Sequence, residues 1–209
     1  MVVFWGRPYL SLLRSLKIGK RIRIDGPGGH SIKMGTPTMG GILITVPVLL
    51  ITVVLNVYNL MGQTVIGRSI LVPLGVMVAY GVLGAIDDLA GVRGMRRGEG
   101  LTARQKIVVE IAMTLAVALV LYFGMDLRSV AIPGVAEKIN IGLFYIPVAM
   151  FVIISAANAA NLTDGLDGLA GIIMASAFVA YGVIAELQGQ IYLVRFCFTI
   201  VGASFAFLW

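Results

Sequence analysis

The sequence carries little charge, one histidine and one cysteine. Only 12% of its 209 residues are charged and 59% are hydrophobic, whereas about a quarter of the residues in a soluble domain are charged. The composition therefore excludes an ordinary soluble domain and predicts a membrane protein. A single cysteine, Cys197, excludes a disulfide within the chain, and a single histidine, His30, excludes a metal site built from several histidines.

Six apolar segments are long enough to cross a bilayer, which takes about 20 residues of helix. They are Met39–Tyr58, Ile70–Ile86, Ile107–Phe123, Leu143–Ala160, Leu169–Leu187 and Tyr192–Trp209. We therefore expect an all-α, polytopic helical membrane protein. Little sequence remains for a separate soluble domain, so residues 1–209 are expected to form one transmembrane domain, with a basic segment at 1–38 and six spans in 39–209.

One loop between these segments carries a weak signal for strands. Val130 and Ile132 alternate with other residues before Pro133-Gly134, and Ile139 and Ile141 alternate after it. Alternation on both sides of a Pro-Gly turn predicts a short hairpin.

The basic residues indicate which loops face the cytoplasm. Twelve of the 16 lie in two stretches, 7–33 and 93–106. Because positive residues are retained on the cytoplasmic side of a membrane, both stretches are expected there. Counting spans then places the cytoplasmic loops near 87–106 and 161–168, so polar residues from distant segments can meet on one face.

Two pairs of aspartates lie at the membrane edges of this face. Asp87 and Asp88 stand where a helix is expected to end, and both the helix dipole and their mutual repulsion disfavour two carboxylates there. Asp164 and Asp167, in Asn161-Leu-Thr-Asp-Gly-Leu-Asp-Gly168, are three residues apart and would share a helix face. A divalent cation would offset the repulsion, and carboxylates without Cys or His favour Mg²⁺. The alternatives are a solvated loop for the first pair and a helix cap for the second.

A glycine-rich stretch at 25–41 precedes the first long span. Glycines expose backbone N–H groups that bind phosphate, while Lys33 offers a positive charge and Thr38 a hydroxyl. The alternative is a flexible connector.

Together these motifs resemble those of the phospho-N-acetylmuramoyl-pentapeptide transferases, bacterial enzymes that begin the lipid-linked steps of peptidoglycan synthesis. The matching stretches are Asp25-Gly-Pro27, His30, Lys33–Gly41, Asp87-Asp88, Leu101–Lys106 and Asn158–Ala170. The resemblance implies a ten-span fold, usually dimeric, in the bacterial plasma membrane. Its cytoplasmic cleft would bind UDP-N-acetylmuramoyl-pentapeptide and undecaprenyl phosphate, and transfer the phospho-sugar-pentapeptide with Mg²⁺ and release of UMP. No nucleic-acid partner is expected.

The resemblance also implies roles for individual residues. Asp87 and Asp88 would be the acidic pair of the active site and candidate metal ligands, with Asp164 and Asp167 as further catalytic acids. The substrate-binding residues would be Lys33, Thr38, Asn161 and Lys106.

The chain departs from the family pattern in several places. Gly91 stands where the family usually has a lysine, and a later metal-binding aspartate and a histidine-rich loop have no counterpart. We therefore expect an internal piece of a longer family member, inactive alone. Two other functions stay open: a sister enzyme that loads another UDP-N-acetylhexosamine phosphate onto polyprenyl phosphate, and a cation carrier, which would place ionisable residues near mid-membrane.

Overall fold

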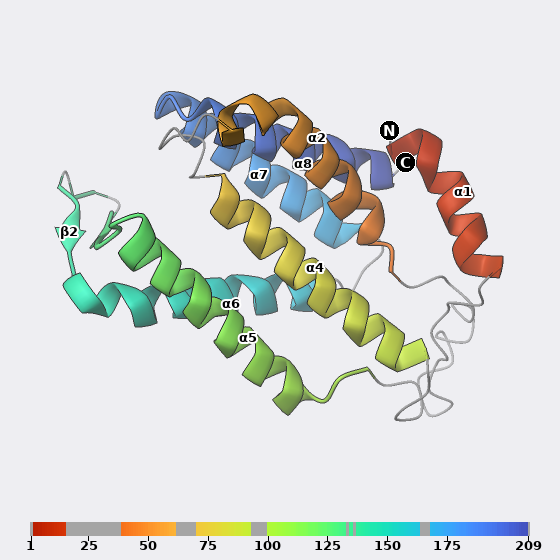
Figure 1. The fold of residues 1–209 in the computed structure, drawn as a ribbon, viewed down its shortest axis with the longest axis horizontal. Helices are drawn as coiled ribbons and strands as arrows, with labels where there is room; N and C mark the ends of the chain where they lie inside the picture. Colours follow the sequence, from red (N-terminus) through yellow and green to blue (C-terminus); the bar gives the residue numbers. More distant parts are fainter. Residues whose placement is uncertain are drawn as a thin grey trace. The chain divides into compact units, whose positions relative to one another are not determined.

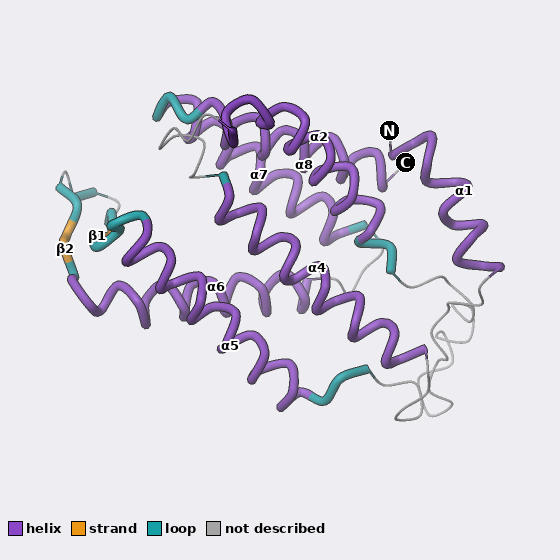
Figure 2. The backbone as a smooth tube through the Cα atoms, viewed as in Figure 1, coloured by secondary structure: helices purple, strands orange, loops and turns teal. Residues whose placement is uncertain are grey.

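The computed structural model of the chain describes residues 2–15, 39–61, 70–92, 100–132, 134–135, 137–163 and 168–208. Helices dominate these residues, as Figures 1 and 2 show. The chain divides into two compact units. The first comprises Met1–Thr102 and Gly171–Trp209, and the second comprises Ala103–Ala170.

Helices of the first unit pack mainly around α2 and α8. The unit contains α1 (Val2–Ser15), α2 (Ile42–Met61), α4 (Leu71–Val92), α8 (Ile191–Leu208) and, apart from its first two residues, α7 (Leu169–Leu187). α2 lies beside α8, α1 contacts both of these helices, and α4 contacts α2. The buried core of this unit is formed by Leu43, Val48, Ile70, Leu74, Phe196, Cys197, Ile200 and Ala203. Cys197 is thus a small buried apolar side chain, as its position in an apolar run suggests.

A tight turn joins α7 to α8. Gly189 has a φ of +68°, a conformation that side chains with a Cβ rarely adopt. Farther along the pair, a Cβ on Gly182 would lie 2.9 Å from the Phe198 ring. A side chain at position 182 would therefore require the Phe198 ring to shift.

In the second unit, two helices are joined by a short hairpin. α5 (Ala103–Leu119) continues as one π-helical turn, η2 (Val120–Gly124), and α6 (Tyr145–Thr163) follows the short 3-10 helix η3 (Gly142–Phe144). Between them, β1 (Ser129–Val130) pairs antiparallel with β2 (Ile139–Asn140), with Ser129 opposite Asn140 and Val130 opposite Ile139. The predicted hairpin is confirmed. Because it joins neighbouring ends of α5 and α6, the two helices run in opposite directions.

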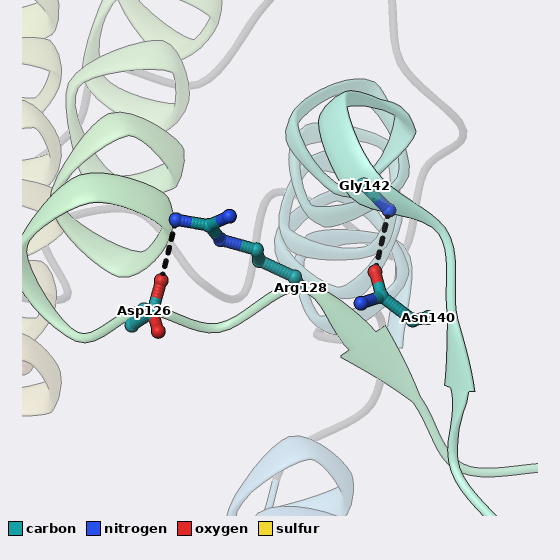
Figure 3. A network of polar contacts seen from close by, with 4 residues as sticks. All are labelled: Asp126, Arg128, Asn140 and Gly142. Carbon is teal, nitrogen blue, oxygen red and sulfur yellow. Dashed lines mark hydrogen bonds and ion pairs between the residues drawn. The ribbon is translucent and has the colours of Figure 1, made fainter.

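Polar contacts hold the base of the hairpin. An Arg128 guanidinium nitrogen lies 2.7 Å from a carboxylate oxygen of Asp126, and the Asn140 side-chain oxygen accepts the Gly142 N–H at 2.9 Å (Figure 3). The same guanidinium lies 5.3 Å from the ring centre of Tyr122, in the π-helical turn. Arg128 is half exposed, so its ion pair contributes little to stability.

The helices match the predicted spans closely. Among the described residues, five helices are long and apolar enough to cross a membrane, judged by length and composition: Leu71–Val92, Ala103–Gly124, Gly142–Thr163, Leu169–Leu187 and Ile191–Leu208. The remaining expected span, Met39–Tyr58, corresponds to α2, of which Ile42–Asn56 is apolar but shorter. The structure confirms the all-α membrane fold class.

Candidate active site

The two adjacent acids, Asp87 and Asp88, lie within α4 rather than at its end. The sequence predicted that the helix stops near Ile86, but α4 continues to Val92. Leucine and alanine follow the acids and favour a helix, so the polar pair does not interrupt it. The expected position at the very end of the helix is therefore wrong by about one turn.

Each acid accepts a backbone N–H from a different loop. The Oδ1 atom of Asp87 lies 2.7 Å from the N–H nitrogen of Leu101, just before α5. The Oδ2 atom of Asp88 lies 2.8 Å from the N–H nitrogen of Met39, just before α2. Consecutive helical residues project about 100° apart, which explains why the two side chains reach different segments. The acidic pair thus fixes the loop ends at Met39 and Leu101 against the last turns of α4.

Met39 occupies a strained position at the start of α2. Its φ of +68° is in the left-handed region, unusual for a residue with a side chain. Its N–H is donated to Asp88, and its carbonyl accepts the Tyr9 hydroxyl at 3.2 Å. These two bonds hold the backbone on both sides of the left-handed residue. Strained backbone of this kind persists where its surroundings hold it, and it is concentrated at functional sites.

Tyr9 links α1 to Met39 and so to the acidic pair. Burial raises the pKa of its hydroxyl above the usual value, and the negative charge of Asp88 raises it further. The neutral phenol that donates to Met39 is therefore favoured across the physiological pH range.

Gly100 permits the close approach on the other side of the acidic pair. A Cβ on Gly100 would lie 2.6 Å from the backbone oxygen of Asp87 and 2.8 Å from its carboxyl carbon. Any side chain here would displace the loop end or the acid. Glycine is thus required for the Leu101 N–H to reach Asp87.

The donor set of the acidic pair suits a hard cation only in combination with other groups. Within the described part of the chain, no three His, Cys, Asp or Glu side chains are grouped closely enough to hold a metal ion. A protein typically holds Mg²⁺ through one or two carboxylates together with substrate phosphates. Asp87 and Asp88 therefore fit a site that is completed by a phosphate-bearing substrate.

Two further predicted residues belong to the second unit. Lys106 lies in the first turn of α5 and is half-buried, and Asn161 lies near the end of α6 and is exposed. About one turn before Asn161 on α6, the side-chain amide of Asn158 donates a hydrogen bond to Glu110 on α5. Sequence reasoning missed Glu110. Its signal was an acid inside an apolar run, four residues after Lys106.

Several predicted site residues lie outside the described residues. These are Lys33, Thr38, Asp164 and Asp167. The described acids and the Lys106–Asn161 region also belong to different units. Convergence of all these groups on one substrate therefore stays a prediction.

Comparison with known proteins identifies a family. The sequence profile described as glycosyl transferase family 4 matches residues 70–209. A protein of Chloroflexus aurantiacus named phospho-N-acetylmuramoyl-pentapeptide-transferase is 46% identical over 209 residues, covering 96% of this chain and 55% of that protein. Proteins of the same name from Chloroflexus aggregans and a Geobacillus species are 44% and 39% identical over 96% of the chain. The chain spans 55–60% of the length of these curated relatives.

Proposed function

Because the chain belongs to glycosyl transferase family 4, we propose that it takes part in phosphoryl-sugar transfer from a UDP-linked donor to a polyprenyl phosphate. The proposed donor is UDP-N-acetylmuramoyl-pentapeptide, and the proposed acceptor is undecaprenyl phosphate. The observation that carries the proposal is the identity of 36–46% to transferases of that name across 96% of the chain. The full activity, substrates and partners are proposed for the complete gene product.

The reaction joins two phosphates. An oxygen of the lipid phosphate attacks the β-phosphorus of the nucleotide sugar and forms a new P–O bond. The bond between that phosphorus and the bridging oxygen breaks, and UMP leaves with the electron pair. Bound Mg²⁺ would neutralise charge on the phosphates, the main requirement of such a transfer.

Residues of the chain would position these groups. We propose that Asp87 and Asp88 contribute carboxylate ligands from the last two turns of α4, together with Asp164 and Asp167. Lys33 would stabilise charge on the departing oxygen, and the hydroxyl of Thr38 and the amide of Asn161 would line the nucleotide side. Lys106 would attract phosphate.

Asp87 has a second proposed role as a base for the lipid phosphate. The need for a base is modest, since a phosphate monoester with a second pKa near 6 is mostly ionised at pH 7. The alternative is a covalent intermediate formed by attack of an aspartate on the β-phosphorus.

The proposed location is the cytoplasmic face of the bacterial plasma membrane. The relatives named above are bacterial, and five helices in the described part of the chain are apolar enough to cross a membrane. The concentration of basic residues in 7–33 and 93–106 supports the cytoplasmic assignment of the site. A homodimer is proposed on the family resemblance.

Exchange of labelled UMP into the UDP-linked substrate tests the function. Membranes containing the complete gene product and undecaprenyl phosphate should return label to UDP-N-acetylmuramoyl-pentapeptide. Exchange with a UDP-N-acetylhexosamine that lacks the peptide, and none with the peptide-bearing donor, would instead support the sister transferase. Cation flux without any exchange would support a carrier.

A further inference from the structure

An acidic residue lies inside one of the apolar helices. Glu110 is seven residues after the first residue of α5, which places it about 10 Å along the helix. It falls within the potential span Ala103–Gly124. A carboxyl group inside a membrane span is costly, so such groups usually have a partner and a function.

The partner of Glu110 is on the neighbouring helix. The Nδ2 atom of Asn158 lies 3.1 Å from the Oε2 atom of Glu110 and 2.9 Å from the carbonyl oxygen of Ile154. An amide nitrogen carries two hydrogens, so both are used, and the bond to Ile154 holds the amide toward Glu110. Within α5, the Thr114 hydroxyl donates to the backbone oxygen of Glu110 at 2.7 Å.

This bond links two helices that run in opposite directions. Lys106 lies one turn from Glu110 on the same side of α5, about 6 Å nearer its start, and Asn161 lies about 4.5 Å from Asn158 toward the end of α6. Since the helices run in opposite directions, both displacements point the same way. Lys106 and Asn161 therefore lie on the same side of the Glu110–Asn158 bond along the two helices.

We propose that Glu110 is a positioning residue: through Asn158 it locks the register of α5 and α6 and so presents Lys106 and Asn161 side by side to one phosphate-bearing substrate. This inference rests on the proposed function for the identity of the substrate class, but the register itself does not depend on it. A slide of one residue would move Lys106 by about 1.5 Å relative to Asn161. That shift is large enough to weaken a charge-assisted hydrogen bond.

Cross-linking measures the register without any activity. In the complete gene product, cysteines other than the introduced pair are removed, including the buried Cys197, and Lys106→Cys is combined with Asn161→Cys. A short bifunctional thiol reagent should join the pair rapidly in membranes. Glu110→Leu should slow the joining by about threefold to tenfold, in line with the strength of hydrogen bonds between membrane helices. Glu110→Gln keeps an acceptor oxygen and should retain the original rate.

Controls separate the register from general loss of structure. Glu186→Leu makes the same replacement at an exposed site near the end of α7 and should leave the rate unchanged. If Glu110→Leu fails to accumulate, Glu110→Gln with Asn158→Asp supplies the second test. In this pair the bond is reversed, because the glutamine amide donates to the aspartate. Asn158→Asp alone should slow cross-linking, and the double variant should restore it.

The substrate readout uses a protein with Lys106 and Asn161 intact. Glu110→Leu should raise the KM for the UDP-linked donor about threefold to tenfold, and Glu110→Gln should keep it near the value of the parent protein. Unchanged cross-linking and unchanged KM in Glu110→Leu would overturn the inference, while UMP exchange by the parent protein would leave the proposed function standing. Altered cross-linking with no exchange by the parent would support the register and overturn the substrate role together with the proposed function.

Discussion

Carboxylates in the two units find their hydrogen-bond donors in different ways. In the last two turns of α4, Asp87 and Asp88 accept backbone N–H groups from Leu101 and Met39, which lie just before α5 and α2. Inside α5, Glu110 accepts a side-chain amide from Asn158. Backbone N–H groups within a helix are already bonded to its own carbonyls, whereas those before a helix begins are not. An acid at a membrane edge can therefore organise loops, while an acid within a span can organise only neighbouring helices.

Removing either kind of acid should therefore affect a different part of the structure. Loss of an edge acid should affect the placement of loops and of substrate phosphates. Loss of the acid within the span should affect helix register. Three sets of variants test the acids in α4, in order of decreasing expected effect.

The largest effect is expected from Asp87→Asn and Asp88→Asn in the complete gene product. Asparagine keeps an oxygen that can accept the N–H of Leu101 or Met39, but it removes the negative charge. If the charge is required for phosphoryl transfer, turnover should fall about 100-fold or more while the protein stays folded. UMP exchange and the apparent midpoint of thermal unfolding in detergent measure the two effects separately.

A matched control is Asp126→Asn, which removes an exposed carboxylate at the hairpin. Its turnover should match that of the parent protein. Near-normal turnover of Asp87→Asn would refute its role as base and as ligand, and would reduce this acid to a loop anchor.

Gly100→Ala should have the next largest effect, on stability. The added Cβ would lie 2.6 Å from the backbone oxygen of Asp87, so the loop end or α4 must shift. The expected loss is about 1–3 kcal/mol of unfolding free energy, as for other overpacked sites. A lower midpoint of thermal unfolding and lower turnover should appear together.

Gly84→Ala provides the comparison within the same helix. No atom lies within 4 Å of a Cβ at Gly84, which is exposed on α4. This change should be neutral or stabilise the protein by up to about 1 kcal/mol, because alanine favours a helix. Equal midpoints for the two alanine variants would show that Gly100 does not lie against Asp87.

The helices, the hairpin and the acidic pair could be predicted from the sequence because each depends on residues that are close together in the chain. The apolar runs predicted the helices, because every backbone group in a span must bond within its own segment. Most helix ends agree to within a few residues, whereas α4 continues past the predicted end at Ile86 to Val92. The hairpin was readable from alternation around Pro133-Gly134. The acidic pair was visible as two carboxylates at the edge of an apolar run.

The partners of these acids were not readable in the same way. Tertiary packing brings Leu101 and Met39 to the acids, from which they are 14 and 49 positions away in the sequence. Tyr9 joins them through its bond to Met39. Backbone donors leave no trace in residue type, so a pattern of side chains cannot reveal them. The π-helical turn at Val120–Gly124 and the continuation of α4 to Val92 were missed for a related reason, since the residues there also suit an ordinary helix or a loop.

The smallest effect is expected from Tyr9→Phe. It removes one partly buried hydrogen bond to the Met39 carbonyl and leaves the bond from the Met39 N–H to Asp88 in place. The unfolding free energy should fall by about 0.5–1.5 kcal/mol. Tyr181→Phe, at an exposed position of α7, should leave the midpoint of thermal unfolding unchanged. Equal shifts for the two variants would show that the bond from Tyr9 to Met39 does not stabilise the fold.

The proposed reaction requires acids from distant segments to share one metal-bound pyrophosphate. Iron-directed cleavage of the complete gene product tests it most directly: Fe²⁺ is loaded with the UDP-linked substrate, and peroxide then cuts the chain near the bound ion. We predict cuts close to both 87–88 and 164–167, suppressed together by excess Mg²⁺ and by Asp88→Asn. Cuts confined to one of these segments, or absent from both, would contradict the account.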